Sequence, residues 1–444
     1  MNDDARPIAW TVAGSDSGGG AGLQADLRAF QAIGVHGCSV LAAITAQNSQ
    51  NVAHIEAVTP ELLDAQFAAL AADMPPAAIK TGLLGSVDNL RVLTRWIDRL
   101  RVDRPSLPVV VDPVLRATTG AAFADGALLQ AYRDELLPRA TLITPNRAEA
   151  AALLGVAPLL RRADVEQAAR ALRETGCRAV AITGGDAGDA TSDDFMLSAQ
   201  AEGWLSLARV ATTHHHGTGC VFASSAAEAM ALGFALAEAV VMAKMATTHA
   251  LRHAYAAGAG AGPTSPCADF AGHIANLPTL SLPGGSTPPA FAPLVDANLG
   301  LYAIVDSASW VRRVLDAGVR TVQLRIKDHA HPALSSEIRE SIAAATACGA
   351  QLFINDHWRA AIDEGAYGVH LGQEDLATAD LGAIARAGLR LGVSTHAGWE
   401  VCRAWAFRPS YIACGPIHPT QAKAMPWIPQ GNGNLAFWSA LLPV

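Results

Sequence analysis

One stretch decides the fold: Gly14-Ser15-Asp16-Ser17-Gly18-Gly19-Gly20-Ala21-Gly22. The apolar run from Ile8 to Ala13 precedes it and predicts a buried strand, and the residues from Leu23 to Ile33 predict a helix. Glycines between a strand and a helix allow the backbone to approach an anionic ligand at the helix N-terminus. Their spacing matches neither the dinucleotide fingerprint nor a Walker loop. The stretch therefore predicts a ligand site of another kind in an α/β fold.

Three further apolar runs end in polar residues, namely Lys80-Thr81-Gly82, Val111-Asp112-Pro113-Val114 and Thr144-Pro145-Asn146-Arg147-Ala148-Glu149. In open α/β sheets the carboxyl ends of the strands form the ligand crevice, so polar residues there are well placed for chemistry. Helical patterns over 61–73, 87–100 and 165–175 alternate with the strands, and two more follow over 221–232 and 235–256. This alternation predicts a doubly wound sheet.

A second glycine motif reads Thr213-His214-His215-His216-Gly217-Thr218-Gly219-Cys220 and opens a run of small residues. The first turn of a helix has unpaired N–H groups, so residues 217–219 predict an anion site. Cys220 lies in the same field, which predicts a lowered thiol pKa and a role as proton acceptor. The alternative is a glycine turn capped by Thr218, with Cys220 as a buried small residue. Adjacent histidines on a strand point to opposite faces, which favours structural or substrate-contact roles over a shared metal ion.

These motifs, with Ala43-Ile44-Thr45-Ala46-Gln47-Asn48, resemble the hydroxymethylpyrimidine and phosphomethylpyrimidine kinase family of thiamine synthesis, which has the ribokinase-like fold. The resemblance runs from about Ile8 to Pro263 and implies a kinase that uses ATP and Mg²⁺. It implies pyrimidine binding by Gly14, Asp26 and Gln47, nucleotide and magnesium binding by Asp112, Asn146, Glu149 and Thr183, an anion hole at Gly217, Thr218 and Gly219, and Cys220 as the catalytic base.

Several of these positions also have a structural interpretation. Asp112 before a proline could end a strand, Gln47 could cap a loop, and Glu149 could be an acid favoured by a helix N-terminus. Gln47 also offers a donor and an acceptor, as an aminopyrimidine edge does. Two other functions stay open. One is a pyridoxal kinase, and the other is a non-catalytic pyrimidine-binding protein, because Thr183 stands where relatives often carry a lysine.

The composition limits the classes of function. The 444 residues predict two or three domains, and the hydrophobic content of 51% indicates well-buried globular units. A net charge of −8 argues against a nucleic-acid surface. The acidic stretch Met1-Asn2-Asp3-Asp4 does not have the pattern of a signal peptide, and we expect no membrane segment because no apolar span is long enough. Seven scattered cysteines argue against a disulfide framework, so we expect a cytoplasmic protein, and the family resemblance suggests a homodimer.

The composition changes over 258–293, which is dense in glycine, proline, serine and alanine. We predict a kinase domain over 1–270, a linker over 271–296 and a second domain over 297–444. Six apolar runs in the second domain each end in polar residues, a pattern typical of a β/α barrel. The runs are 301–306, 322–327, 352–356, 368–375, 391–396 and 411–416.

Asp356 and Asp375 follow two of these strands and predict a magnesium site. Four other side chains are suited to neutralise a pyrophosphate, namely Gln323, Arg325, Lys327 and Lys423. From Asn298 to about Leu442 the chain resembles thiamine phosphate synthase, which joins the pyrimidine pyrophosphate to thiazole phosphate. The resemblance adds substrate roles for Asn355, Ser394 and Thr420.

The barrel pattern stops after about six of the eight strands of a TIM-type barrel. We therefore expect a partial (β/α)8 barrel with two unpaired edges and an incomplete phosphate site, which leaves full synthase activity in doubt. A degraded domain and a partial barrel kept for binding are alternatives, and we favour a fragment of a longer protein.

Overall fold

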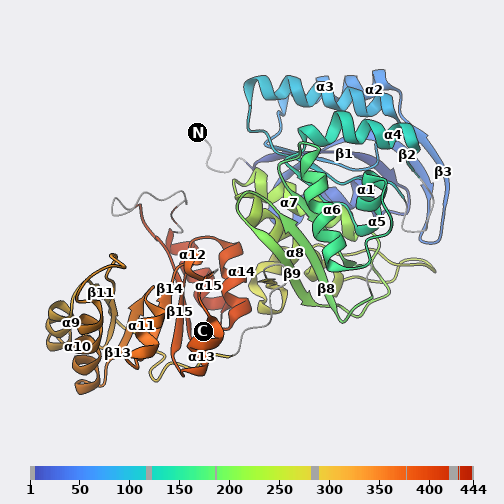
Figure 1. The fold of residues 1–444 in the computed structure, drawn as a ribbon. Helices are drawn as coiled ribbons and strands as arrows, with labels where there is room; N and C mark the ends of the chain where they lie inside the picture. Colours follow the sequence, from blue (N-terminus) through green and yellow to red (C-terminus); the bar gives the residue numbers. More distant parts are fainter. Residues whose placement is uncertain are drawn as a thin grey trace. The chain divides into compact units, whose positions relative to one another are not determined.

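A ten-stranded mixed sheet and a six-stranded parallel sheet form the framework of the chain (Figure 1). The computed structural model describes residues 6–116, 123–185, 188–281, 290–376, 378–419, 429 and 431–442. The chain divides into two units between residues 283 and 284. Each unit has a hydrophobic core of its own.

The sheet of the first unit runs in the order β10-β9-β8-β7-β6-β5-β4-β1-β2-β3. Its strands from β2 through β1 and β4 to β7 pair in parallel, which confirms the predicted doubly wound arrangement, and the strands toward both edges are antiparallel. Because β2 lies on one side of β1 and β4 on the other, the order reverses at β1. Ligands of open α/β sheets bind at such a point. The strands are β1 (Ile8–Asp16), β2 (His36–Gln47), β3 (Val52–Ala57), β4 (Ala78–Thr81), β5 (Val109–Val111), β6 (Leu142–Ile143), β7 (Val180–Ile182), β8 (Thr191–Leu197), β9 (Glu202–Ala208) and β10 (Thr279–Ser281).

Helices cover this sheet (Figure 1). Helix α7 packs against both α1 and α8, and α1 and α7 also contact β1, while α2 packs against α3 and β2. The helices are α1 (Gly22–Ile33), α2 (Pro60–Asp73), α3 (Val87–Asp103), α4 (Gly126–Ala131), α5 (Arg147–Leu154), α6 (Arg162–Glu174), α7 (Thr218–Ala231) and α8 (Leu236–Arg252), with short turns η1 (Tyr132–Leu136), η2 (Leu137–Arg139), η4 (Ala268–Gly272) and η5 (Ile274–Asn276).

Aromatic side chains join the sheet to its helices. Trp10 of β1 lies 5.9 Å from the ring of Phe67 on α2, which stacks at 5.7 Å on Trp96 of α3. Such rings bury a large apolar area and dominate core energetics. The two helices begin where the sequence supplies a cap, since Thr59 and Ser86 each accept a backbone N–H from the first turn.

Part of the predicted linker belongs to the first unit. Residues 268–276 form two short turns, and β10 pairs antiparallel with β9 as an edge strand. Leu280 of β10 is fully buried. A strand of three residues is too short to give a detectable alternation, which is why the predicted linker started too early.

The second unit is a parallel sheet in sequence order from β11 to β16, with β11 and β16 at its edges. This confirms the predicted six strands of a partial barrel. The strands are β11 (Tyr302–Val305), β12 (Thr321–Leu324), β13 (Gln351–Asn355), β14 (Gly368–Leu371), β15 (Arg390–Thr395) and β16 (Tyr411–Cys414). The helices are α9 (Ala308–Asp316), α10 (Leu334–Ala347), α11 (Trp358–Asp363), α12 (Gln373–Leu376), α13 (Leu381–Arg386), α14 (Gly398–Phe407) and α15 (Gly431–Leu441).

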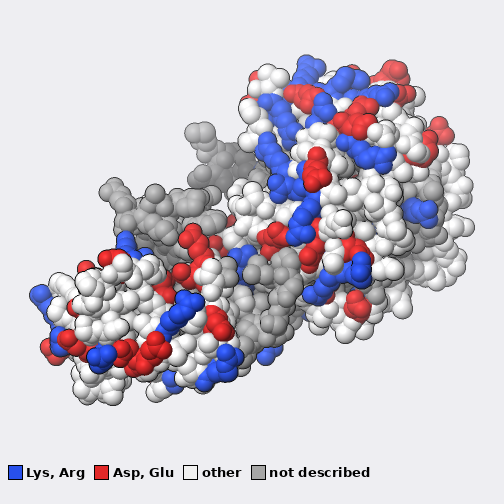
Figure 2. Space-filling model, viewed as in Figure 1, with Lys and Arg blue, Asp and Glu red and all other residues white. Residues whose placement is uncertain are grey.

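The charges on the visible face of the first unit are mixed. Figure 2 shows basic and acidic side chains interspersed over the helices α2, α3 and α4, so the basic side chains visible there do not form a continuous stripe. Within the described parts of the chain, every helix is too short or too polar to cross a membrane.

Candidate active site

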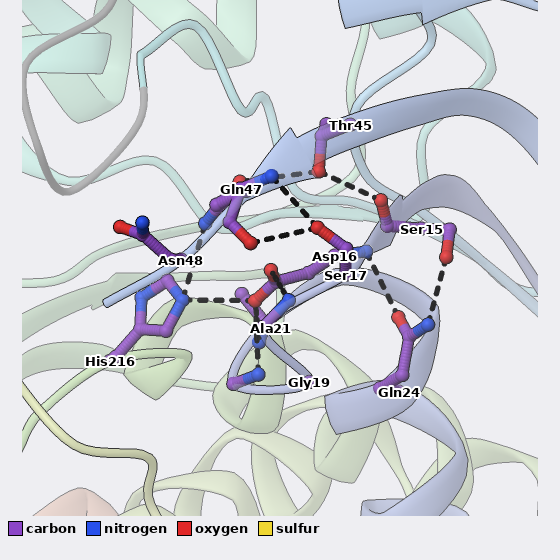
Figure 3. A network of polar contacts seen from close by, with 12 residues as sticks. Ser15, Asp16, Ser17, Gly19, Ala21, Gln24, Thr45, Gln47, Asn48 and His216 are labelled. Atoms are coloured by element: carbon purple, nitrogen blue, oxygen red, sulfur yellow. Dashed lines mark hydrogen bonds and ion pairs between the residues drawn. The ribbon is translucent and has the colours of Figure 1, made fainter. Parts of the chain in front are cut away.

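The glycine loop after β1 wraps around the carboxylate of Asp16 (Figure 3). Asp16 Oδ1 accepts the N–H of Gly18 at 2.8 Å, and Oδ2 accepts those of Gly20 and Ala21 at 2.9 Å each. Burial alone would raise the pKa of Asp16, but His216 and these backbone donors bring it below its usual value. These loop N–H groups are therefore bonded to an ionised side chain of the loop itself.

Two of the three residues predicted to bind a pyrimidine lie at the carboxyl ends of neighbouring strands. Gly14 marks a register shift in β1, and Gln47 ends β2. The Nε2 atom of Gln47 lies 3.3 Å from Nε2 of His216, which in turn lies 3.0 Å from Asp16 Oδ2. Gly20 packs against this ring, since a Cβ atom there would lie 2.1 Å from its Cδ2 atom.

The two glycine motifs meet beside β1. Gly217 precedes α7 with a φ of 83°, and a Cβ atom at this position would lie 2.1 Å from the carbonyl oxygen of Gly20. Only glycine fits both constraints. The hydroxyl and N–H of Thr218 donate to the His215 carbonyl at 2.5 and 3.3 Å, so both donors of this residue of the predicted anion hole are used within the turn that begins α7.

The predicted contact between Asp26 and the pyrimidine is wrong. Its side chain is fully buried, and its oxygens accept hydrogen bonds from Lys80 Nζ at 2.8 and 2.9 Å. The hydroxyls of Thr11 and Ser224 donate to the same carboxylate at 2.6 and 2.8 Å. Lys80 also lies 3.7 Å from Asp112. Asp26 is thus the counter-ion of a buried lysine and has no surface for a ligand.

Cys220 lies in the first turn of α7, as expected, but its predicted low pKa is wrong. Burial raises the pKa of the thiol to about 12, and the nearby Lys80 lowers it by less. Burial also raises the pKa of Asp112 to about 6, again opposed by Lys80. The charge of Lys80 therefore does not compensate for the burial of this thiol.

The residues predicted for magnesium and nucleotide follow the ends of three neighbouring strands, β5, β6 and β7. Asn146 forms a β-bridge with Thr183. Asn146 and Glu149 form a capping box for α5, because each side chain accepts the backbone N–H of the other at 2.9 Å. Burial raises the pKa of Tyr132, and the charges of Asp112 and Glu149 raise it further. Both carboxylates therefore lie near the same tyrosine.

In the second unit, Asp356 and Asp375 come together as predicted. Asp356 follows β13 with a φ of 61°, and Asp375 lies on α12. Burial raises the pKa of Asp356 to about 6, and the adjacent Asp375 adds to this effect. Asn355 donates to Asp356 Oδ2 at 2.5 Å. Two neighbouring carboxylates with an amide beside them are a donor set that suits a divalent cation.

A chain of hydrogen bonds crosses the inside of the partial barrel. Ser394 Oγ lies 2.7 Å from Nε2 of His370, whose Nδ1 lies 2.7 Å from the hydroxyl of Tyr411. The hydroxyl of Tyr302 joins Tyr411 at 2.6 Å and accepts from Gln323 at 3.5 Å. Burial lowers the pKa of His370 to about 4, so the ring is neutral. Ser394 and Gln323 therefore belong to one buried network, which the sequence did not reveal.

A groove of about 800 Å³ opens at the carboxyl ends of β11 and β12. Arg325 and Lys327, both predicted to neutralise a pyrophosphate, line it together with Trp310 and His331. The predicted residues Thr420 and Lys423 lie outside the described residues.

Residues 16–265 match a family model described as "Phosphomethylpyrimidine kinase". The chain belongs to this family. A second model, described as "Thiamine monophosphate synthase", matches residues 301–444. The kinase match contains the first glycine motif from Asp16 onward, the second glycine motif and the strand ends between them. The synthase match contains all six strands of the second unit.

Three relatives support these assignments, the first over both units, the second for the kinase and the third for the synthase. The chain is 36% identical to the "Probable thiamine biosynthetic bifunctional enzyme, chloroplastic" of Oryza sativa, over 95% of this chain and 77% of that protein. The "Hydroxymethylpyrimidine/phosphomethylpyrimidine kinase" of Synechococcus elongatus is 43% identical over 58% of this chain and 96% of its own length. The "Thiamine-phosphate synthase" of Cronobacter sakazakii is 60% identical over 33% of this chain and 70% of its own length.

Solved structures agree with the fold of the kinase unit. An ADP complex of Bacillus subtilis pyridoxal kinase superposes with a TM-score of 0.55 at 32% identity, over 59% of this chain and 98% of that one. A Staphylococcus aureus pyridoxal kinase in complex with AMP-PCP and pyridoxal gives 0.54 at 29% identity, over 59% of this chain and 93% of that one.

The kinase unit contains three functional candidates that the sequence did not single out as site residues: Asp16, Lys80 and His216. Asp16 lies in the first glycine motif, and Lys80 lies at the end of an apolar run. His216 was one of three consecutive histidines, and only its burial separates it from its exposed neighbour His215. For Asp16 and Lys80, the position at the end of a strand was the signal that the sequence offered. The sequence did not indicate which residue each side chain contacts.

A cluster of histidines at the end of α8 has the composition of a metal site but uses its donors internally. Asn276 Oδ1 accepts from Arg252 at 2.7 Å, so its amide nitrogen faces His249 Nδ1 at 3.1 Å and donates to it. His249 Nε2 therefore carries the hydrogen and donates to Asp269 at 3.0 Å. Both ring nitrogens of this buried histidine are occupied within the protein, beside His253, Cys267 and His273.

Proposed function

We propose that the first unit transfers phosphate from ATP to 4-amino-5-hydroxymethyl-2-methylpyrimidine, and then to its monophosphate to give the pyrophosphate. The observation that carries this proposal is the contact between the two glycine motifs, in which Gly217 meets the backbone of Gly20. They meet where the strand order reverses, within the stretch that matches the kinase family. Gln47 beside them offers the donor and acceptor that an aminopyrimidine requires.

The phosphate side of this site is built from backbone and charge. Phosphoryl transfer depends mainly on alignment and on neutralising charge. The start of α7 supplies a partial positive charge, and Gly217 and Gly219 let a phosphate approach it closely. Lys80 adds a full positive charge in the interior, held in place by Asp26.

Magnesium prefers oxygen ligands, and the residues on this side form such a set. We propose that Asp112, Asn146 and Glu149 hold Mg²⁺ and the nucleotide phosphates, with Thr183 beside them. The shared effect of Asp112 and Glu149 on Tyr132 supports a single region for the two carboxylates. When bound, the ion would neutralise charge on the phosphates.

Cys220 is the proposed acceptor for the proton of the substrate hydroxyl. Its thiol is neutral in the ligand-free protein because burial raises its pKa. The loose transition state of phosphoryl transfer makes little demand on covalent chemistry, so a weakly activated base suffices. Lys80 is the neighbouring group that favours the thiolate.

Pyridoxal phosphorylation is the second candidate activity, because the chain superposes on pyridoxal kinases. The Synechococcus relative, named for the pyrimidine, is 43% identical, against 32% for the Bacillus pyridoxal kinase. This difference favours the pyrimidine as the substrate.

For the second unit we propose binding of the pyrimidine pyrophosphate and its coupling to thiazole phosphate. Asp356 and Asp375 would hold Mg²⁺, and Arg325 and Lys327 would neutralise the pyrophosphate. The close synthase relative over this unit supports the assignment. From composition and resemblance we also propose a cytoplasmic location and a homodimer, although the name of the rice relative includes the word chloroplastic.

One incubation tests both units. The purified chain is mixed with magnesium ATP and hydroxymethylpyrimidine, with and without thiazole phosphate, and the products are resolved by mass. Pyrimidine pyrophosphate alone supports the kinase and an inactive second unit, and thiamine phosphate supports both activities. If no phosphorylated pyrimidine forms, pyridoxal is tried next. Failure to bind magnesium ATP at millimolar concentrations in calorimetry would leave a pyrimidine-binding protein.

A further inference from the structure

His216 and Gln47 face each other with two nitrogen atoms, 3.3 Å apart (Figure 3). His216 Nε2 also lies 3.0 Å from Asp16 Oδ2. An ionised carboxylate only accepts hydrogen bonds, so Nε2 carries the hydrogen and donates it to Asp16. The same nitrogen therefore cannot accept a hydrogen from the Gln47 amide.

The other contact of the Gln47 amide is mismatched in the same way. Thr45 Oγ1 lies 2.9 Å from the Ser15 carbonyl oxygen and 3.5 Å from Gln47 Oε1. A hydroxyl has one hydrogen, and the shorter contact to Ser15 takes it. Toward Gln47, Thr45 can therefore only accept. When the amide is turned by 180°, its NH2 group faces the Thr45 oxygen, which can accept. Its oxygen then faces the Nε2–H of His216, which Asp16 at 3.0 Å and Gln47 at 3.3 Å share as a three-centre hydrogen bond. The hydrogen-bond network is what decides between these two assignments.

We propose that the Asp16–His216 pair fixes the Gln47 amide with its oxygen toward His216 and its NH2 group toward Thr45, so that the pocket accepts an aminopyrimidine edge in a single orientation. An aminopyrimidine carries a donor amine next to an acceptor ring nitrogen, and a fixed amide pairs with that edge in one order only. The inference rests on the proposed function. His216 is a positioning residue, since it acts on the substrate through Gln47.

The surroundings of His216 hold the ring in place. Its backbone N–H donates to the carbonyl of Gly262 at 3.1 Å, and its own carbonyl accepts the N–H of Thr264 at 3.1 Å. Gly20 leaves no room behind the ring, and Asp16 is itself fixed by three backbone N–H groups. A donor held this firmly can impose one amide orientation before the substrate arrives.

Steady-state kinetics test the positioning role. His216→Leu removes the donor, and we expect the KM for the pyrimidine to rise about tenfold while the KM for ATP stays within about twofold. His216→Gln returns an amide nitrogen near the position of Nε2 and should restore most of the affinity. His215→Leu, at the exposed neighbour, is the matched control and should leave both KM values unchanged. An unchanged pyrimidine KM in His216→Leu would overturn the inference.

A double-mutant cycle separates positioning from a general structural effect. Gln47→Ala alone should raise the pyrimidine KM about tenfold, and adding His216→Leu should then raise it by less than about twofold, because the residue through which His216 acts is gone. Independent effects that multiply to about 100-fold would contradict the inference.

A spectroscopic measurement needs no substrate and so distinguishes this inference from the proposed function. In ¹⁵N NMR of histidine-labelled protein, the His216 signals are those lost in His216→Gln, and we expect the Nε2–H tautomer. An Nδ1–H tautomer would overturn the inference whatever the activity. A wild-type chain with this tautomer but no activity on the pyrimidine would instead overturn the proposed function, and with it the pyrimidine as the ligand of Gln47. Should His216→Leu not fold, His216→Gln and this spectrum still decide.

Discussion

At the scale of single residues, Cys220 shows how burial outweighs a neighbouring cation, because its pKa is raised to about 12 despite the nearby Lys80. We expect Cys220→Ala to lower kcat about 100-fold and to leave the pyrimidine KM nearly unchanged, since it removes a proton acceptor and no binding contact. Initial rates over a range of both substrates measure the two effects separately. Cys348→Ala, at an exposed cysteine of the second unit, is the control. A nearly normal rate in Cys220→Ala would remove this thiol from the mechanism.

A second residue-scale effect concerns stability. Glu228 of α7 is fully buried, and burial raises its pKa to about 10. In the unfolded chain a glutamate has a pKa of about 4.3. Between that pH and the folded pKa, the unfolded chain has released a proton that the folded chain keeps, so the free energy of unfolding falls as the pH rises. Glu228→Gln removes this loss. Calorimetry should show a higher unfolding midpoint for the variant at pH 8 and little difference at pH 4, with the exposed Glu174→Gln as the control. Equal differences at both pH values would contradict the assignment.

At the scale of elements, the start of α5 combines a cap with the proposed magnesium site. Asn146→Ala should destabilise the first unit by about 1 kcal/mol, because an N-cap is lost, and should also raise the KM for ATP. Asn146→Ser keeps a capping oxygen and removes the amide. We therefore expect near-normal stability with a raised KM for ATP, measured by chemical unfolding and by kinetics. A normal KM for ATP in the serine variant would leave Asn146 with the structural role alone.

The same scale shows what local pattern can and cannot predict. The glycine loop, α1 and the six strands of the second unit follow from runs of apolar residues, and the start of α1 differs from the prediction by one residue. The contact between Asp16 and His216 joins residues 200 positions apart, and no local pattern encodes it. Asp26 sits on the buried side of a correctly predicted helix, so its position was predictable, while its pairing with Lys80 depends on the packing of α1 against the sheet.

At the scale of the whole molecule, two hydrophobic cores predict two sites that respond to substitution independently. Asp375→Asn removes one of the paired carboxylates of the second unit and should abolish magnesium-dependent binding of inorganic pyrophosphate there, while the kinase kcat stays within about twofold. Calorimetry with Cys220→Ala is the reciprocal measurement, and its pyrophosphate affinity should equal that of the wild type. The two variants distinguish independent from coupled units. One substitution can change both the kinase kcat and the pyrophosphate affinity only if there is a coupling free energy between the two sites. A loss of pyrophosphate binding in Cys220→Ala would therefore show coupling between the units, and binding that persists in Asp375→Asn would place the magnesium ligands elsewhere.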